Sequence, residues 1–146
     1  MGGRLSGSAA SARLRLRVVA GALLDARGRV LIAQRPPGKH LAGRWEFPGG
    51  KIAEGETEAM ALARELREEL GIELRRCEAL MTLAHAYPDR DVELHLHVVP
   101  EFGGEPRGLD GQQIKWVPLD QLGDEDLLEA DRPFIDALQR HRPSAR

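Results

Sequence analysis

The sequence predicts a single domain of the α/β (α+β) class, and three observations support this. Short strand-like segments lie on both sides of one long segment, residues 57–71, whose apolar residues recur every three or four positions as in a helix. A second helical segment follows the last strand-like segment. At 146 residues, the chain is long enough for one domain with its own core. We expect this domain at residues 14–141, between a flexible Gly-, Ser- and Ala-rich leader (1–13) and a polar tail (142–146).

Composition and charge exclude several classes of protein. The net charge of −2 argues against a nucleic-acid polymer as partner, because proteins that bind phosphate backbones are usually basic. No apolar run approaches transmembrane length, so no membrane partner is expected. The single Cys77 excludes an internal disulfide and fits a reducing cytoplasm. We therefore expect a cytoplasmic protein that is a monomer or a small homo-oligomer.

The first strands are expected before the long helix. Residues 14–24 begin with alternation and become continuously apolar, which is typical of a strand that enters a buried sheet. A turn signal at residues 25–28 separates them from a second apolar segment, residues 30–33, and the spacing predicts a hairpin. Residues 45–47 form a third, short strand-like segment just before Gly49.

Between the second and third segments, prolines and a glycine open a loop that is rich in basic residues. These residues are Arg35, Lys39, His40 and Arg44. Basic groups here can neutralise the phosphates of a substrate. For Lys39 and Arg44, ordinary solubility of a loop is an equally good interpretation.

The helix of residues 57–71 has clear ends. Thr57 is suited to the N-cap, because its side-chain oxygen can accept from a free N–H of the first turn. Gly71 suits the position just after the last turn, where a left-handed backbone favours glycine. One apolar stripe is expected, made of Ala59, Leu62, Ala63, Leu66 and Leu70.

Carboxylates are unusually dense on this helix. Glu65, Glu68 and Glu69 share one face by their spacing, and a solvated face paired by Arg64 and Arg67 is the simplest interpretation. However, Glu54 and Glu56 precede the helix, after a Gly-Gly turn. Because Mg²⁺ takes oxygen ligands and is commonly held by one or two carboxylates plus phosphate oxygens, this arrangement indicates a Mg²⁺–phosphate site.

Further strands are expected after the helix, at residues 78–86, 92–99 and 114–117. The first two are joined by a turn at residues 87–90. In the second, His95 and His97 lie on one side. Such a pair can bind zinc, but no thiolate or further His is near in the sequence. A solvated or pocket-lining role is therefore favoured. A helical turn is expected from Pro118, and a C-terminal helix from Asp131 with Phe134, Ile135 and Leu138 as its apolar side.

The stretch from Gly50 to Ile72 resembles the Nudix box. Gly50, Glu56 and the run of residues 64–72 fill every position of that pattern. Similarity to the MutT-type branch covers about residues 15–140, through residues 35–50, 87–90, 104–106, 108–112, Trp116 and 130–133. The resemblance implies the Nudix fold, a mixed β-sheet sandwiched between helices, with the box as a loop–helix–loop.

The resemblance also implies an activity. MutT-type enzymes use Mg²⁺, with Mn²⁺ as an alternative, to hydrolyse nucleoside triphosphates to the monophosphate and pyrophosphate. Oxidised dGTP (8-oxo-dGTP) is the first expected substrate, in nucleotide-pool sanitation that protects DNA synthesis, and CTP or 5-methyl-dCTP is the second. ADP-ribose and dinucleoside polyphosphates match the flanking motifs less well. A non-catalytic nucleotide-binding regulator is the alternative of another class, and the intact carboxylates speak against it.

The resemblance assigns roles to individual residues. The implied metal ligands are the Gly49 carbonyl, Glu65, Glu68, Glu69 and Asp110, where the shorter Asp replaces the Glu of MutT-type enzymes. The implied catalytic residues are Glu65 as general base with Glu68 as the second choice, Arg64 holding the carboxylates, and Glu56 supporting the loop or an outer metal. The implied substrate-binding residues are Arg35 and His40, near the phosphates and sugar, and Asp131 near the base.

Asp131 is where the sequence departs from the MutT-type pattern, which has asparagine. An ionised aspartate only accepts hydrogen bonds, which suits the N4 amino group of cytosine and would repel O6 of 8-oxoguanine. If burial raises its pKa, the protonated form becomes a donor as well. The alternative is a plain helix N-cap before Arg132 and Pro133.

Overall fold

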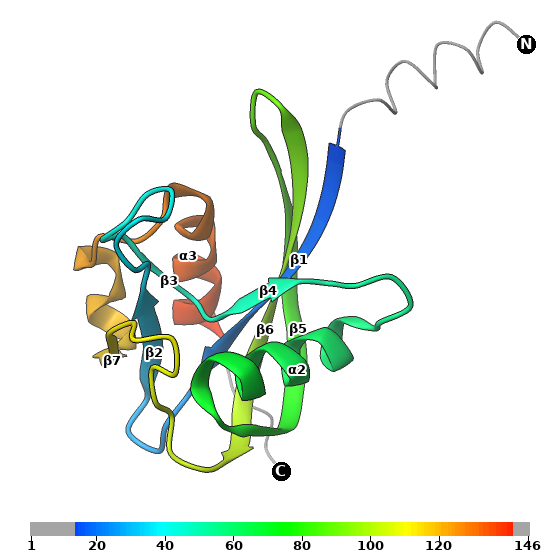
Figure 1. Ribbon diagram of the computed structural model, residues 1–146. Helices are drawn as coiled ribbons and strands as arrows, with labels where there is room; N and C mark the ends of the chain where they lie inside the picture. Colours follow the sequence, from blue (N-terminus) through cyan, green and yellow to red (C-terminus); the bar gives the residue numbers. More distant parts are fainter. Residues whose placement is uncertain (1–13, 142–146) are drawn as a thin grey trace, which may run out of the picture.

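Two β-sheets form the centre of the structure, a computed structural model that describes residues 14–141 (Figure 1). The predicted leader and tail lie outside the described residues. The larger sheet has the order β4-β1-β6-β5. Its strands are β4 (Gly49–Lys51), β1 (Leu14–Leu23), β6 (Arg90–Gly103) and β5 (Glu73–Ala86). β1 runs parallel to β6 and the other neighbours are antiparallel, so the sheet is mixed.

The smaller sheet is antiparallel and has the order β3-β2-β7. Its strands are β3 (Trp45–Glu46), β2 (Arg29–Gln34) and β7 (Ile114–Pro118). Two helices and two 3-10 turns complete the structure: α2 (Glu58–Leu70), η1 (Leu119–Asp124), η2 (Glu129–Asp131) and α3 (Pro133–Arg140). None of the helices within the described residues is both long and apolar enough to cross a membrane.

The two helices cover opposite faces of the larger sheet. Leu62 and Leu66 of α2 pack in one apolar cluster with Val19 of β1. Phe134 and Leu138 of α3 belong to a second cluster, together with alternate residues of β6. This arrangement confirms the predicted mixed sheet between helices (Figure 1).

Helix α2 has the ends that its sequence predicts. The Met60 N–H donates to the Thr57 hydroxyl at 3.1 Å, and Gly71 has a left-handed backbone with φ of 69°. Leu62, Leu66 and Leu70 are fully buried, as expected. The stripe is displaced at its start, because Ala61 is buried and Ala59 is exposed.

We expect Leu66→Ala to lower the free energy of unfolding by about 2–5 kcal/mol, since it removes a fully buried side chain from the contact between α2 and the sheet. Urea unfolding followed by circular dichroism measures this change. Met60→Ala is the matched control on the same helix, because Met60 is exposed, and its effect should stay within about 0.5 kcal/mol. Equal effects of the two substitutions would contradict the packing described.

The predicted hairpin between residues 14–24 and 30–33 is wrong. Both edges of β1 are occupied, one by β4 and the other by β6, so no edge remains for β2. The turn at residues 25–28 instead carries the chain from one sheet to the other, with a single bridge between Leu24 and Val30. β2 pairs with β3 and β7.

The strands after α2 are longer than predicted. β5 begins five residues before Glu78, and β6 extends beyond residues 92–99 at both ends. The predicted turn at residues 87–90 does join them as an antiparallel hairpin, which projects from the body of the structure beside β1 (Figure 1). The strand ending at Pro118 and the helical turn after it are confirmed.

Candidate active site

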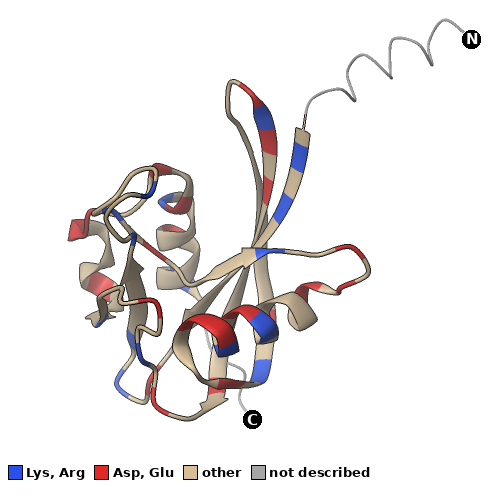
Figure 2. Ribbon diagram, in the orientation of Figure 1, with Lys and Arg blue, Asp and Glu red and all other residues tan. Residues whose placement is uncertain are grey.

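A cavity of about 650 Å³ has walls from both sheets, α2, the loop after β6 and η2. This volume is in the range of small-molecule sites. Its lining is apolar along β1 and β6, where Leu16, Val18 and Leu94 lie. Glu69 and Asp110 line it, and so do Glu46 and Asp131. The acidic residues of α2 stand beside basic ones in the same turns (Figure 2).

Two carboxyl groups of α2 meet at the Gly-Gly turn. Glu65 and Glu69 share a hydrogen bond, and the Gly49 N–H donates to Glu69. The Glu65 carboxyl lies so close to Gly50 that a Cβ at this position would collide with it. Burial, followed by the neighbouring Glu65 and Glu46, raises the pKa of Glu69 well above its ordinary value. Two acidic side chains are therefore held in contact at this turn.

The guanidinium of Arg64 contacts three glutamate carboxylates. It contacts Glu56 at 2.8 and 2.9 Å, Glu65 at 2.9 Å and Glu68 at 3.5 Å. It also donates to the Lys51 carbonyl at 3.0 Å. Hydrogen bonds from Arg64 and from the Ala53 N–H lower the pKa of Glu56 to about 2. These are the contacts expected of Arg64 and Glu56, and their roles in catalysis stay predictions.

The structure does not gather all the predicted metal ligands. Within residues 14–141, no group of three or more His, Cys, Asp or Glu side chains is close enough to hold a metal ion together. Glu65 and Glu69 are in contact, whereas the Glu68 side chain is 59% exposed and contacts Arg64. Gly49 donates its N–H to Glu69, and the role of its carbonyl as a metal ligand stays a prediction.

The loop after β6 brings Asp110 to the cavity by binding the end of α2. The N–H groups of Arg107 and Leu109 donate to the carbonyls of Leu70 and Glu69, each at 3.0 Å. These are carbonyls that the last turn of a helix leaves without a partner inside the helix. The side-chain amide of Gln112 donates a second hydrogen bond to the Glu69 carbonyl, at 3.3 Å, and its amide oxygen accepts from the Asp110 N–H.

Asp131 lies buried in another wall of the cavity, with 7% of its surface exposed. Its carboxyl accepts from the Phe47 N–H at 3.4 Å. Burial, and secondarily Glu46, raise its pKa to about 7, against opposing effects of Phe47 N–H and Arg35. The capping interpretation is wrong, because the N-cap position of α3 is occupied by Arg132 and the helix has no side-chain cap.

Glu46 is a site residue that the sequence reasoning missed. It lines the cavity on β3, and Arg35 contacts it at 3.0 Å. Burial raises the pKa of Glu46, against the effect of Arg35. The sequence signal available for Glu46 was a charged residue inside a short strand-like segment that lies just before the Gly-Gly turn.

The basic loop divides into residues at the cavity and residues away from it. Arg35 and Lys39 line the cavity. The His40 side chain is exposed, and His40 contributes its backbone carbonyl, which accepts from Arg35 at 2.7 Å. Arg44 contacts Asp126 at 3.4 Å, so its role here is to anchor the loop.

The solvated or pocket-lining role predicted for His95 and His97 is wrong. Both are 7% exposed, and both contact Glu58 of α2 rather than the cavity. The sequence missed this because burial of the second face of β6 depends on where α2 packs.

The buried carboxyl of Asp131 should make stability depend on pH. Its pKa is about 7 in the folded chain against an ordinary 3.8, so the folded state keeps a proton that the unfolded state loses. The resulting stabilisation is complete below about pH 4 and is lost as the pH rises through about 7. The Asp131→Asn side chain stays neutral at every pH. The variant's free energy of unfolding should therefore rise relative to that of the wild type by up to about 4 kcal/mol between about pH 4 and pH 8. Urea unfolding across this range measures the difference, and parallel pH curves would contradict it.

Comparisons with known proteins agree with this geometry. A family model described as "NUDIX domain" matches residues 19–137. The chain is 46% identical over 130 residues to a "Putative 8-oxo-dGTP diphosphatase 2" of Mycobacterium tuberculosis (strain CDC 1551 / Oshkosh), covering 84% of this chain and 87% of the relative. It is 36% identical over 124 residues to a "CTP pyrophosphohydrolase" of Escherichia coli (strain K12), covering 85% and 92%. The solution structure of the E. coli ORF135 protein is 35% identical with a TM-score of 0.80, covering 92% and 97%. The family model and these relatives show that the chain belongs to the Nudix domain family.

Proposed function

We propose that this chain hydrolyses nucleoside triphosphates to the monophosphate and pyrophosphate, with 8-oxo-dGTP as the first-choice substrate. The observation that carries the proposal is that one cavity joins the box carboxyl Glu69 to the buried Asp131. Such a cavity can hold the phosphates at one wall and the base at another. We also propose a place in nucleotide-pool sanitation in the cytoplasm.

The residues beside the Gly-Gly turn fit a magnesium ion. Mg²⁺ commonly takes one or two carboxylates and completes its shell with water and substrate phosphates, so the contact pair Glu65 and Glu69 suffices on the protein side. Burial and then the neighbouring Glu65 and Glu46 raise the pKa of Glu69, and a positive ion would oppose the repulsion between these carboxyl groups. Glu65 and Glu69 would hold it, with Glu68 and Asp110 as further candidates, and Mn²⁺ is the alternative. When bound, the ion supplies charge neutralisation and a more acidic water.

The chain's own side chains supply the rest of the chemistry. Arg35 and Lys39 line the cavity and can bind phosphate oxygens. Glu65 accepts the proton of the water that attacks the β-phosphorus, and Arg64 holds its carboxylate at 2.9 Å. Glu56 fixes Arg64 in turn, and the Ala53 N–H holds the Glu56 carboxylate at 2.8 Å.

At the base, the proton on Asp131 decides what is recognised. With a pKa of about 7, the carboxyl can donate to O6 of 8-oxoguanine and accept from its N7–H. Asparagine makes the same two bonds, so a protonated Asp131 can replace it. The Mycobacterium tuberculosis relative, which carries the name 8-oxo-dGTP diphosphatase, supports this choice.

A cytidine triphosphate is the second candidate. The ionised Asp131 only accepts hydrogen bonds, which suits the N4 amino group of CTP or 5-methyl-dCTP. The Escherichia coli relative is named for CTP, which favours this candidate over other nucleotides.

Pyrophosphate release with Mg²⁺ tests the proposal, on 8-oxo-dGTP, dGTP, 5-methyl-dCTP, CTP, dATP and ADP-ribose between about pH 6 and pH 8.5. We expect kcat/KM for 8-oxo-dGTP to exceed that for dGTP, and to fall about tenfold relative to CTP as Asp131 ionises above about pH 7.

Asp131→Asn is the control for this panel, because it cannot ionise and should keep its activity on 8-oxo-dGTP at alkaline pH. A preference for cytidines at every pH would move the enzyme to the second candidate. No turnover on any triphosphate would overturn the proposal in favour of diphosphate substrates or a binding role.

A further inference from the structure

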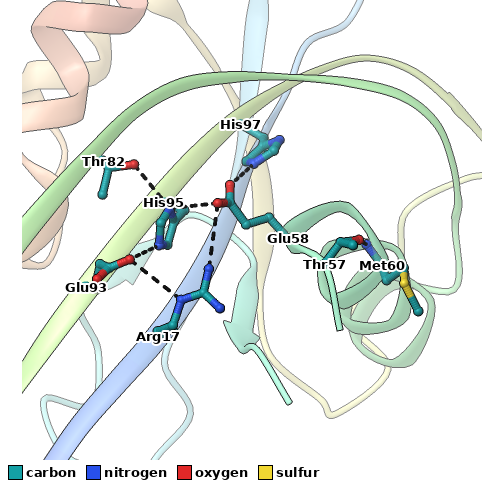
Figure 3. Close-up of polar contacts among 8 residues, drawn as sticks. All are labelled: Arg17, Thr57, Glu58, Met60, Thr82, Glu93, His95 and His97. Carbon is teal, nitrogen blue, oxygen red and sulfur yellow. Dashed lines mark hydrogen bonds and ion pairs between the residues drawn. The ribbon is translucent and has the colours of Figure 1, made fainter. Parts of the chain in front are cut away.

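A buried polar cluster lies beneath the first turn of α2, away from the cavity. Alternation along β6 directs Leu94 toward the cavity and His95 and His97 toward α2. There they meet Glu58, the first residue of the helix (Figure 3). The function proposed above uses none of these side chains.

His95 is placed between two carboxylates. Its Nδ1 lies 3.1 Å from Glu58 Oε2, and its Nε2 lies 2.6 Å from Glu93 Oε2. Thr82 Oγ1 also lies 3.1 Å from Nδ1. Figure 3 shows the ring between the two acids, with the ring itself buried.

The number of hydrogens favours a charged ring. A neutral imidazole has one N–H, so one of its nitrogens would keep a lone pair within 3.1 Å of a carboxylate oxygen. A ring with two N–H groups is positively charged: it donates from Nε2 to Glu93 in a charge-assisted bond and lies within ion-pair distance of Glu58. Thr82 can donate to a neutral Nδ1, but the Glu58 oxygen would still lie beside that lone pair.

The charges around the His95 ring also favour its doubly protonated form. Glu58 and Glu93 bring two negative charges, whereas Arg17 brings one positive charge, at 3.8 and 3.6 Å from them. A hydrogen bond from His97, opposed by burial, lowers the pKa of Glu58, and the charge of Arg17 acts in the same direction, so Glu58 brings a negative charge to the ring. On β5, burial together with Glu58 and Glu78 raises the pKa of the Cys77 thiol, so this neighbour adds no negative charge.

His97 provides an internal contrast. Its Nε2 lies 2.7 Å from Glu58 Oε1, while its Nδ1 is buried with no hydrogen-bond partner among the described residues. A second proton on this ring would leave a buried donor unsatisfied. The two histidines therefore differ in the number of protons that their surroundings accept.

We propose that His95 carries a proton on both ring nitrogens at neutral pH and, in this form, joins Glu58 of α2 to Glu93 of β6 as a positioning residue for the box helix. We call these three residues, Glu58, His95 and Glu93, the clasp. Thr57 and Met60 belong to the same helical turn as Glu58 (Figure 3). In this proposal the clasp keeps the hydrogen bonds of that turn formed. Glu65 and Glu69 follow two and three turns later on the same rigid helix. Loss of the clasp would therefore shift the Glu65 and Glu69 carboxylates, although no residue of the clasp lines the cavity. Its effect on turnover rests on the function proposed above.

The first experiment is nitrogen NMR of the full chain labelled with ¹⁵N-histidine, near pH 7, with signals assigned by His95→Gln and His97→Gln. We expect two protonated ring nitrogens for His95, and one protonated and one unprotonated nitrogen for His97. An unprotonated nitrogen on His95 overturns the proposal. This measurement needs no substrate, so it stands even if the proposed function fails.

The second experiment compares Glu93→Gln with Glu101→Gln, which breaks another exposed ion pair of β6, to Arg76 at 3.1 Å. We expect Glu93→Gln to raise amide hydrogen exchange of Met60 and Ala61 about tenfold, and to lower kcat about tenfold with KM nearly unchanged. Glu101→Gln should change neither by more than about twofold. Unchanged exchange in Glu93→Gln overturns the positioning role whether or not the wild type turns over triphosphates.

Discussion

Glu65→Gln should lower kcat for triphosphate hydrolysis by about 10³-fold and leave KM nearly unchanged. The amide cannot take up a proton, whereas its shape allows the contact with Arg64 to persist. In the proposed function, Arg35 and the wall around Asp131 bind the substrate, so at saturating Mg²⁺ the loss should fall on the chemical step. Steady-state kinetics with Mg²⁺ at about pH 8 measure both constants.

Glu68→Gln is the matched comparison on the same helix. The Glu68 side chain is 59% exposed and has Arg64 as its contact, so we expect a loss of about tenfold or less. A larger loss in Glu68→Gln than in Glu65→Gln would exchange the roles of the two residues. Unchanged turnover in Glu65→Gln would refute the mechanism.

Gly50→Ala should reduce kcat by about 10²-fold although it adds one methyl group. The new Cβ would collide with the Glu65 carboxyl, which has to move to make room. A displacement of about 1 Å in a catalytic group can cost this much. Because Gly50 lies in β4 without a left-handed backbone, the strand itself should tolerate alanine.

Gly123→Ala is the control for this substitution, since a Cβ at Gly123 meets nothing within 4 Å. It should keep full activity, and both variants should show the circular dichroism of the wild type. Full activity of Gly50→Ala would show that Glu65 can act from a different position, which would contradict the close approach described here.

The sequence predicted the features whose causes are local. Thr57, Gly71 and the spacing of Leu62, Leu66 and Leu70 were sufficient to place α2, because caps and periodicity act within the helix itself. The position of Asp131 in a site was also predicted, and its raised pKa was stated as a condition that burial then met.

The failures concern contacts between distant segments. The hairpin was wrong because the partners of β1 come from β4 and β6, which lie 25 or more residues away in the chain. The environment of His95 and His97 depends on the packing of α2 on β6, and Glu46 became a site residue because η2 lies beside it. Sequence patterns record which face of a strand a residue occupies, but not what covers that face.

The separate origin of the two ends of the cavity has a consequence for how substrate range can diverge. In the proposed function, the reacting carboxylates come from α2 beside the Gly-Gly turn, whereas the wall that meets the base comes from β3 and η2. A substitution in β3 or η2 can therefore change the preferred nucleotide while the hydrolytic apparatus stays intact. Relatives of similar length that are named for an oxidised purine and for a pyrimidine are the outcome that such modular inheritance would leave.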